Sequence, residues 1–365
     1  MKKNTCVHNY IENNIINDNM NIVVFAGGTL GHIKPALAIS NELKKHKYNV
    51  YFLSDNSKFK DVIKGNNCLE KVLFFDSPGL NRKNILKNFV NLFALIKTYF
   101  MIKKKLKVIR PKICIGMGGS ISTIGLLASI GYKKIIHEQN AVIGLGNRIV
   151  MNKCDRCYSN FELNGFITIG NPLNECLSKN CNENQEILIL SGSNGSKTIN
   201  DFFINNINYL IKIFNRKINI ITGKKYYNEN IYKIKHINNI YDNKIVNIIP
   251  FTNDIDNYYQ KSFLVIARAG AGTLSEIFNY NLLAIIIPSP NVTNNHQYYN
   301  SLYYYERCCI EMIEEKNLTL DKIKESYEKI KLNQNKMKQN IKNNHNIYSK
   351  YLIVSEVEDI IKSNV

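Results

Sequence analysis

The residues best suited to chemistry follow a glycine-rich turn near the start of the chain. The apolar run 22–26 leads into Gly27-Gly28-Thr29-Leu30-Gly31, and His32 stands where a helix is expected to begin. Glycine lets the backbone approach a ligand closely, and a helix N-terminus offers unpaired amide donors to an anion. Histidine titrates nearest physiological pH, so His32 is a candidate general base. A tight connection with an incidental surface histidine is the alternative.

A second turn of this kind occurs about half a chain later. An expected strand over 186–190 is followed by the turn 191–196, which includes Ser193, and by a helix from Lys197. The turn is not a Walker A loop, because its glycine spacing is too short and no Gly-Lys-Ser/Thr triplet occurs. It predicts a second anion-binding turn in a second α/β domain.

The segment 268–276 combines a basic residue, glycines and an acid. Arg268 precedes a turn with Gly270, Gly272 and Thr273, and Glu276 falls one turn inside the following helix. An acid in that position is suited to accept hydrogen bonds from vicinal hydroxyls, as acidic residues do from ribose. The alternative is that Glu276 only complements the helix dipole, at about 0.3–1 kcal/mol. The neighbouring glycines and Arg268 favour ligand binding.

The elements that position these turns alternate between strands and helices. The first half predicts strands over 22–26, 49–54, 112–116 and 134–137, and helices over 32–46, 84–106 and 120–130. The second half predicts strands over 186–190, 217–222, 244–249, 262–267 and 282–287, helices over 197–214, 253–261, 272–279, 317–345 and 349–362, and a polar loop with His296 and Gln297. Such alternation predicts parallel sheets with right-handed crossovers and functional loops at the carboxyl ends of strands. A chain of 365 residues is long enough for two such domains.

Composition and net charge limit the classes of ligand and partner that the chain is expected to bind. The net charge of +19 raises nucleic acid or an anionic membrane surface as partners. The lysines are scattered and no nucleic-acid-binding motif accompanies them, so nucleic acid is not expected, whereas anionic lipid and diphosphate ligands fit. Cys154 and Cys157 form a lone C-x-x-C without the further ligands of a zinc site, so no metal or cofactor is expected. Residues 1–20 are polar and asparagine-rich, which predicts a disordered leader rather than a signal peptide.

The helix expected over 84–106 has apolar residues on more than one face. A stripe at helical spacing comprises Phe89, Leu92, Phe93, Ile96 and Phe100, and Val90, Ala94, Leu95, Met101 and Ile102 lie off it. One face can pack on a sheet, and the other, next to Lys97 and the lysines at 103, 104, 105 and 107, suits a membrane surface. A buried helix with a solvated lysine tail is the alternative.

The ordered motifs GGTLGH, GMGGSISTIG, HEQNAVIGLGNR, GNPL, SGSNGSKTIN, RAGAGTLSE and NNHQYYNS span about residues 20–305. This series resembles the MurG family of transferases, which add N-acetylglucosamine to the lipid-linked muramyl-pentapeptide precursor of peptidoglycan. The resemblance implies an α/β fold of GT-B architecture, with two Rossmann-like parallel-sheet domains facing a cleft. It implies an acceptor and membrane-facing domain over 21–173, a UDP-sugar-binding domain over 174–345, and a terminal helix in 346–365 that returns to the first domain.

The resemblance also implies roles for individual residues. Arg268, Gly272 and Thr273 would meet the nucleotide and its phosphates, Glu276 the ribose, Gln297 and Asn140 the sugar hydroxyls, and Ser193 the donor. Gly28, Thr29, Gly31, Gly118 and Gly119 would face the acceptor diphosphate, with His32 as general base. The implied reaction is inverting transfer from UDP-N-acetylglucosamine to the C4 hydroxyl of lipid I, giving lipid II. The implied location is peripheral, on the cytoplasmic face of the cell membrane.

Three departures from the family pattern keep other interpretations open. Leu30 replaces the third glycine of the family's GGTGGH, Asn174 stands where the family carries an arginine, and His296 occupies a position filled by glutamine in some members. One alternative is another GT-B enzyme that uses a UDP-sugar, either a glycolipid synthase or an epimerase. The other is a binding protein of the same fold that has lost catalysis. Leu30 and Asn174 favour it, and the following residues disfavour it: His32, Asn140, Arg268, Glu276 and Gln297.

Overall fold

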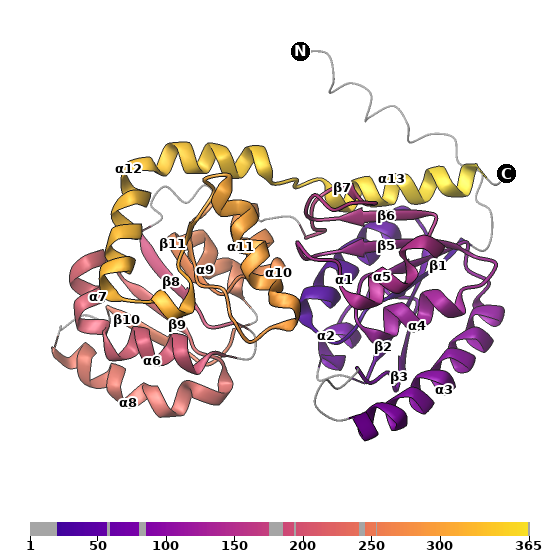
Figure 1. The fold of residues 1–365 in the computed structure, drawn as a ribbon, viewed down its shortest axis with the longest axis horizontal. Helices are drawn as coiled ribbons and strands as arrows, with labels where there is room; N and C mark the ends of the chain where they lie inside the picture. Colours follow the sequence, from indigo (N-terminus) through magenta and orange to yellow (C-terminus); the bar gives the residue numbers. More distant parts are fainter. Residues whose placement is uncertain are drawn as a thin grey trace, which may run out of the picture.

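Two parallel sheets organise the chain. The computed structural model describes residues 20–56, 59–79, 85–174, 185–192, 195–240, 245–252 and 254–363. Figure 1 shows two α/β domains side by side, with the N-terminal half in indigo and magenta and the C-terminal half in pink to yellow. Residues 1–19 of the leader expected over 1–20 lie outside the described residues, as does Ser193.

The N-terminal sheet has seven strands in the order β3-β2-β1-β4-β5-β6-β7, all paired in parallel. Its strands are β1 (Asn21–Phe25), β2 (Asn49–Asp55), β3 (Lys71–Phe75), β4 (Ile113–Gly116), β5 (Lys133–Glu138), β6 (Arg156–Ser159) and β7 (Ile167–Thr168). Its helices are α1 (Leu30–Lys45), α2 (Lys60–Lys64), α3 (Ile85–Ile109), α4 (Ser120–Ala128) and α5 (Leu145–Val150), followed by the short turn η1 (Met151–Lys153). Every residue of β1 is buried because helices cover both faces of the sheet.

The C-terminal sheet has six parallel strands in the order β10-β9-β8-β11-β12-β13. Its strands are β8 (Glu186–Leu190), β9 (Ile218–Ile221), β10 (Val246–Ile249), β11 (Ser262–Ala267), β12 (Leu283–Ile286) and β13 (Glu311–Met312). Its helices are α6 (Lys197–Asn205), α7 (Ile207–Phe214), α8 (Lys224–Ile240), α9 (Ile255–Lys261), α10 (Ala271–Asn279) and α11 (His296–Glu306), with short turns η2 (Thr293–Asn295) and η3 (Glu315–Asn317). The two sheets confirm the expected fold class.

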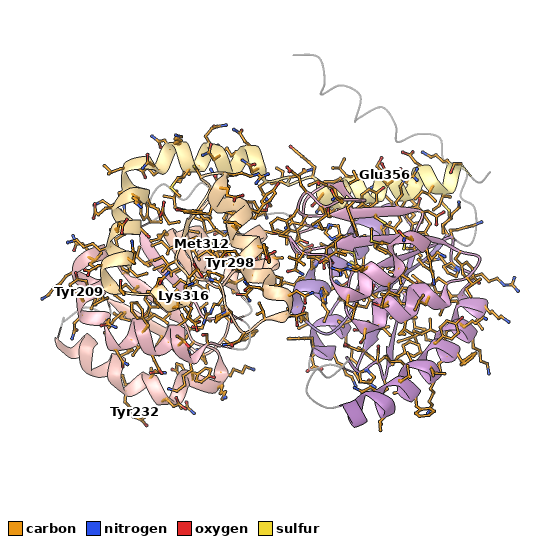
Figure 2. All side chains as sticks on the ribbon, in the orientation of Figure 1. Tyr209, Tyr232, Tyr298, Met312, Lys316 and Glu356 are labelled. Atoms are coloured by element: carbon orange, nitrogen blue, oxygen red, sulfur yellow. The ribbon has the colours of Figure 1, made fainter. Side chains whose placement is uncertain are left out.

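The last two helices connect the domains. Helix α12 (Leu320–Asn344) packs on the C-terminal domain, and α13 (Ser349–Lys362) lies over the N-terminal sheet, as the yellow ribbon in Figure 1 shows. Ile353 and Val357 of α13 are buried in the core beneath α1. The Tyr158 hydroxyl donates to Glu356, which is labelled on α13 in Figure 2, at 2.6 Å. The chain therefore crosses back to its first domain.

Some elements differ from the sequence-based expectation. The single helix expected over 197–214 is wrong, because α6 ends at Asn205 and α7 begins at Ile207. Asn206 lies between them, and its side-chain amide donates to the Phe202 carbonyl. Such bonds between an asparagine side chain and its own backbone compete with helix continuation. The polar loop expected to hold His296 and Gln297 is the first turn of α11. The strands β3, β6, β7 and β13 were not expected from the sequence.

Candidate active site

His32 lies in the first turn of α1, directly after the β1 turn. Its Nδ1 lies 2.8 Å from the Gly27 carbonyl oxygen. A carbonyl oxygen only accepts hydrogen bonds, so Nδ1 carries a proton, and in the neutral imidazole Nε2 then has the lone pair. The turn thus fixes the imidazole in the form that a general base requires.

Two further glycines complete this turn at the end of β4. Gly118 and Gly119 have φ of +106° and +84°, a region that favours glycine. A Cβ on Gly118 would lie 2.6 Å from the His32 ring, and one on Gly119 would lie 2.7 Å from the Gly27 carbonyl oxygen. The structure therefore brings Gly28, Gly118, Gly119 and His32 together. Thr29 is the N-cap of α1, and Gly31 follows within its first turn.

Leu30 fits this turn without strain. It is the first residue of α1 and does not have positive φ, whereas Gly28 has φ of +79°. The conformational freedom of glycine is therefore needed at position 28 and not at position 30. This departure from the family pattern leaves the turn formed.

A network around Glu138 orders the loop at the end of β5. Its Oε1 accepts from the backbone and side-chain amides of Asn140, at 3.0 and 3.3 Å. Its Oε2 accepts from the Gly144 N–H and the Asn147 amide, both at 2.9 Å. The Glu138 carboxylate thus holds the loop 138–144 closed and orients Asn140.

The loop 138–144 also reaches the second domain, through a residue that the sequence argument missed. Asn300 of α11 donates to Asn140 Oδ1 at 3.2 Å and to the Ala269 carbonyl at 3.1 Å, and its Oδ1 accepts from the Ala141 N–H at 2.7 Å. Asn300 is fully buried. Its signal in the sequence was its position in the NNHQYYNS motif, one helical turn after Gln297.

The N-termini of α1 and α10 meet between the domains. A Cβ on Gly272 would lie 3.8 Å from the Cα of Gly31. Figure 1 shows the two helices side by side at the centre of the molecule. We call the surface where α1 and the loop 138–144 meet α10 and α11 the domain junction. Two helix N-termini at one place favour an anion there.

Glu276 of α10 lies at the domain junction and accepts a hydrogen bond at each carboxylate oxygen. Its Oε1 is 2.5 Å from Lys34 Nζ of α1, and its Oε2 accepts from the Tyr259 hydroxyl at 3.1 Å. Tyr259 is buried, and burial together with the Glu276 charge raises its pKa well above the usual value. Lys34 was not singled out from the sequence, because nothing in the chain order indicates a partner so distant.

Arg268 is anchored within the C-terminal domain. Its guanidinium donates to the carbonyls of Ile287 and Pro288, to Ser196 Oγ and to the Glu315 carboxylate. It is 8% exposed. The side chain thus ties three segments of the C-terminal domain together, and its contact with the donor phosphates stays a prediction.

Gln297 and Asp55 complete the description of the site. Gln297 Oε1 accepts from the Ser289 N–H at 2.9 Å, which fixes the side chain against the loop after β12.

Asp55, at the end of β2, was missed from the sequence. A Cβ on Gly27 would lie 2.7 Å from its carboxyl carbon, so Asp55 demands glycine at position 27. Its signal was an acid at the end of the second strand of a Rossmann-like unit.

Comparisons with known proteins place this chain in a family. Two family models match the chain. The model described as "Glycosyltransferase family 28 N-terminal domain" matches residues 22–159, and the model described as "Glycosyltransferase family 28 C-terminal domain" matches residues 186–362. A MurG crystal structure from Acinetobacter baumannii superposes with a TM-score of 0.73 at 22% identity, covering 93% of this chain and 99% of that one. A putative UDP-N-acetylglucosamine 2-epimerase from Listeria monocytogenes shares the fold, with a TM-score of 0.64 at 13% identity over 94% of this chain and 97% of that one.

The curated relatives distinguish between the transferase family and the epimerase family for this chain. The transferase of Vesicomyosocius okutanii subsp. Calyptogena okutanii is 32% identical over 87% of this chain and 91% of its own length. That of Caldanaerobacter subterraneus subsp. tengcongensis is 31% identical over 85% of this chain and 90% of its own length. The chain belongs to the family of UDP-N-acetylglucosamine–N-acetylmuramyl-(pentapeptide) pyrophosphoryl-undecaprenol N-acetylglucosamine transferases.

Proposed function

We propose that this chain transfers N-acetylglucosamine from UDP-N-acetylglucosamine to the C4 hydroxyl of lipid I, with inversion at the anomeric carbon. The observation that carries the proposal is the free Nε2 of His32 in the turn that opens α1, where the N-termini of α1 and α10 meet. The relatives named for this reaction support it. Release of UDP that requires a lipid I analogue is the experiment that tests it.

We infer a role for each part of the domain junction. The acceptor hydroxyl gives its proton to His32 Nε2, and its oxygen attacks the anomeric carbon. The bond from that carbon to the β-phosphate oxygen breaks, and its electron pair leaves with UDP. The N-terminal amides of α1 and α10 are directed at the developing negative charge, which backbone donors stabilise without reorganisation. Gly28, Gly118 and Gly119 leave room for the acceptor diphosphate beside His32.

We expect Glu276→Ala to weaken UDP binding by about tenfold or more. A carboxylate that accepts hydrogen bonds from the ribose hydroxyls is worth about 1.5–3 kcal/mol. Calorimetry with UDP measures the loss, and Glu306→Ala, at the far end of α11, is the matched control that removes an equal charge from the same domain. An unchanged UDP affinity in Glu276→Ala would remove Glu276 from the donor site.

Helix α3 has an exposed apolar face that fits a membrane surface. Val90, Phe93 and Phe100 are 70%, 73% and 62% exposed, whereas Ile102, Leu106 and Ile109 pack on the sheet. Lys97, Lys104, Lys105 and Lys107 are exposed on the same helix, and the side chain of Phe89 lies outside the described residues. Within the described residues, no helix has the length and hydropathy to cross a membrane. We therefore propose peripheral binding of this face to anionic lipid at the cytoplasmic surface.

We expect the protein to sediment with phosphatidylglycerol vesicles and to be released by salt, because lysine attraction to anionic lipid is screened by ions. Phe93→Ser with Phe100→Ser should lower vesicle affinity by more than tenfold, since each buried phenylalanine contributes about 1.5–3 kcal/mol. Leu332→Ser on α12 is the control, because that leucine is 84% exposed in the other domain. Equal recovery in the supernatant with and without vesicles would refute the proposal.

A further inference from the structure

We propose that Lys34 is a donor-binding residue that moves from Glu276 to the diphosphate of the UDP-sugar and neutralises the leaving group. The inference rests on the proposed function and adds a cation, supplied by the N-terminal domain, to the donor site of the other domain. It is carried by the position of Lys34, by the hydrogen bonds that Glu276 already makes, and by the partners of Arg268.

Lys34 belongs to α1 but points into the second domain. Its Nζ lies 2.5 Å from Glu276 Oε1, across the domain junction. The backbone of α1 is close to α10 at the same place, since a Cβ on Gly272 would lie 3.8 Å from the Gly31 Cα. The ammonium group thus stands one helical turn from the N-terminus of α10, where the donor phosphates are proposed to bind.

A ribose that binds Glu276 meets the two partners that this carboxylate already has. Lys34 donates to Oε1, and the Tyr259 hydroxyl donates to Oε2. Tyr259 is 1% exposed, whereas the Lys34 side chain is 44% exposed and sits on a flexible stem. Each carboxylate oxygen has a second lone pair, so the ribose hydroxyls compete with the ammonium at Oε1, and Lys34 is the partner that can move away.

The Lys34 ammonium, once released from Glu276, adds to the donor site a positive charge that Arg268 does not supply. Arg268 is engaged by Glu315 and two carbonyls, so its charge is already balanced inside the C-terminal domain. A diphosphate that leaves with an additional negative charge gains from a nearby cation. The exposed pair with Glu276 is worth little in water, so exchanging the carboxylate for a diphosphate at two helix N-termini favours the new position.

The test compares UDP with uridine, which has the ribose but no phosphate. Calorimetry is run at low salt on the wild-type chain, Lys34→Gln and Lys34→Arg. We expect Lys34→Gln to weaken UDP binding by about tenfold, the scale of one charge-assisted hydrogen bond, while uridine binds as well as before or more tightly. Lys34→Arg keeps the charge and should stay within about threefold of the wild type for UDP.

A matched control removes the same charge from the same helix. Lys45 lies in the last turn of α1, is 61% exposed and pairs with Glu42, away from the domain junction. Lys45→Gln should leave the affinities for UDP and uridine unchanged. An equal loss in Lys45→Gln and Lys34→Gln would assign the effect to general electrostatics and overturn the proposal.

Three other outcomes would also overturn it. Unchanged UDP binding in Lys34→Gln would show that the ammonium does not reach the diphosphate. Tighter binding of both UDP and uridine would make Lys34 a competitor for Glu276 and nothing more. Equal weakening of both ligands would indicate a structural role. Failure of the wild-type chain to bind UDP would instead refute the proposed function, so the two failures are distinguishable.

Discussion

His32→Ala should lower turnover by roughly 10²-fold or more, the scale of a lost general base. The loss is expected because Nδ1 is held by the Gly27 carbonyl and Nε2 is left to receive the acceptor proton. The free energy of unfolding should fall by only about 1 kcal/mol, since a single hydrogen bond is removed. Steady-state kinetics and thermal unfolding of the same preparation measure both effects.

His46→Ala is the control for this experiment. His46 follows the other end of α1, is exposed, and its Nδ1 lies 2.8 Å from Glu358 of α13. Its replacement removes a histidine near the same helix without approaching the domain junction, so turnover should not change. A His32→Ala protein that melts much earlier but turns over normally when folded would make His32 a structural residue.

The second large effect is a loss of stability in mild acid. Burial lowers the pKa of His137 and of His345 from 6.5 to about 4. His137 is fully buried, and within the described residues neither ring nitrogen of His345 has a hydrogen-bond partner. Because both folded pKa values are depressed, the unfolded chain binds more protons between pH 6.5 and 4. The free energy of unfolding is therefore highest above pH 6.5 and falls as the pH drops through this window.

Each of these histidines should lower the free energy of unfolding by about 2 kcal/mol between pH 7 and pH 5, because one pKa unit corresponds to about 1.4 kcal/mol. Urea unfolding of wild type and His345→Leu at both pH values measures the contribution of one. Leucine cannot titrate, and the ring it replaces has Phe278 as a neighbour at 6.1 Å between ring centroids. The difference between the two proteins should shrink or reverse at pH 5. An identical pH dependence would contradict the account.

The sequence predicted the central elements because their residues carry one plain signal. Strands β8 and β11 were predicted with the boundaries that they have, because central parallel strands are continuous apolar runs. Helix α13 was also predicted with the boundaries that it has. Strand β3 was missed because it is an edge strand whose first four residues are not fully buried. Helix α11 was missed for a different reason. Its buried residues are Asn300, Ser301 and Tyr304, so apolar periodicity does not reveal it.

The site was predictable where it depends on local backbone and not where it depends on distant partners. The turn with Gly28 and His32 follows from glycine chemistry and helix geometry, which act within a few residues. The pairs of Lys34 with Glu276 and of Arg268 with Glu315 join residues from different elements, and only the folded arrangement brings them together. For this reason the sequence did not indicate Glu315 as the partner of Arg268 and did not single out Lys34.

The measurement that tests the central claim most directly is analysis of the product formed from UDP-N-acetylglucosamine and a short-chain lipid I analogue. The account predicts UDP release only when the acceptor is present. It also predicts a product heavier than the acceptor by one N-acetylglucosamine, with that sugar on the C4 oxygen and in the β configuration by NMR coupling. Retention of the α configuration, attachment to another hydroxyl, or UDP release without an acceptor would contradict it.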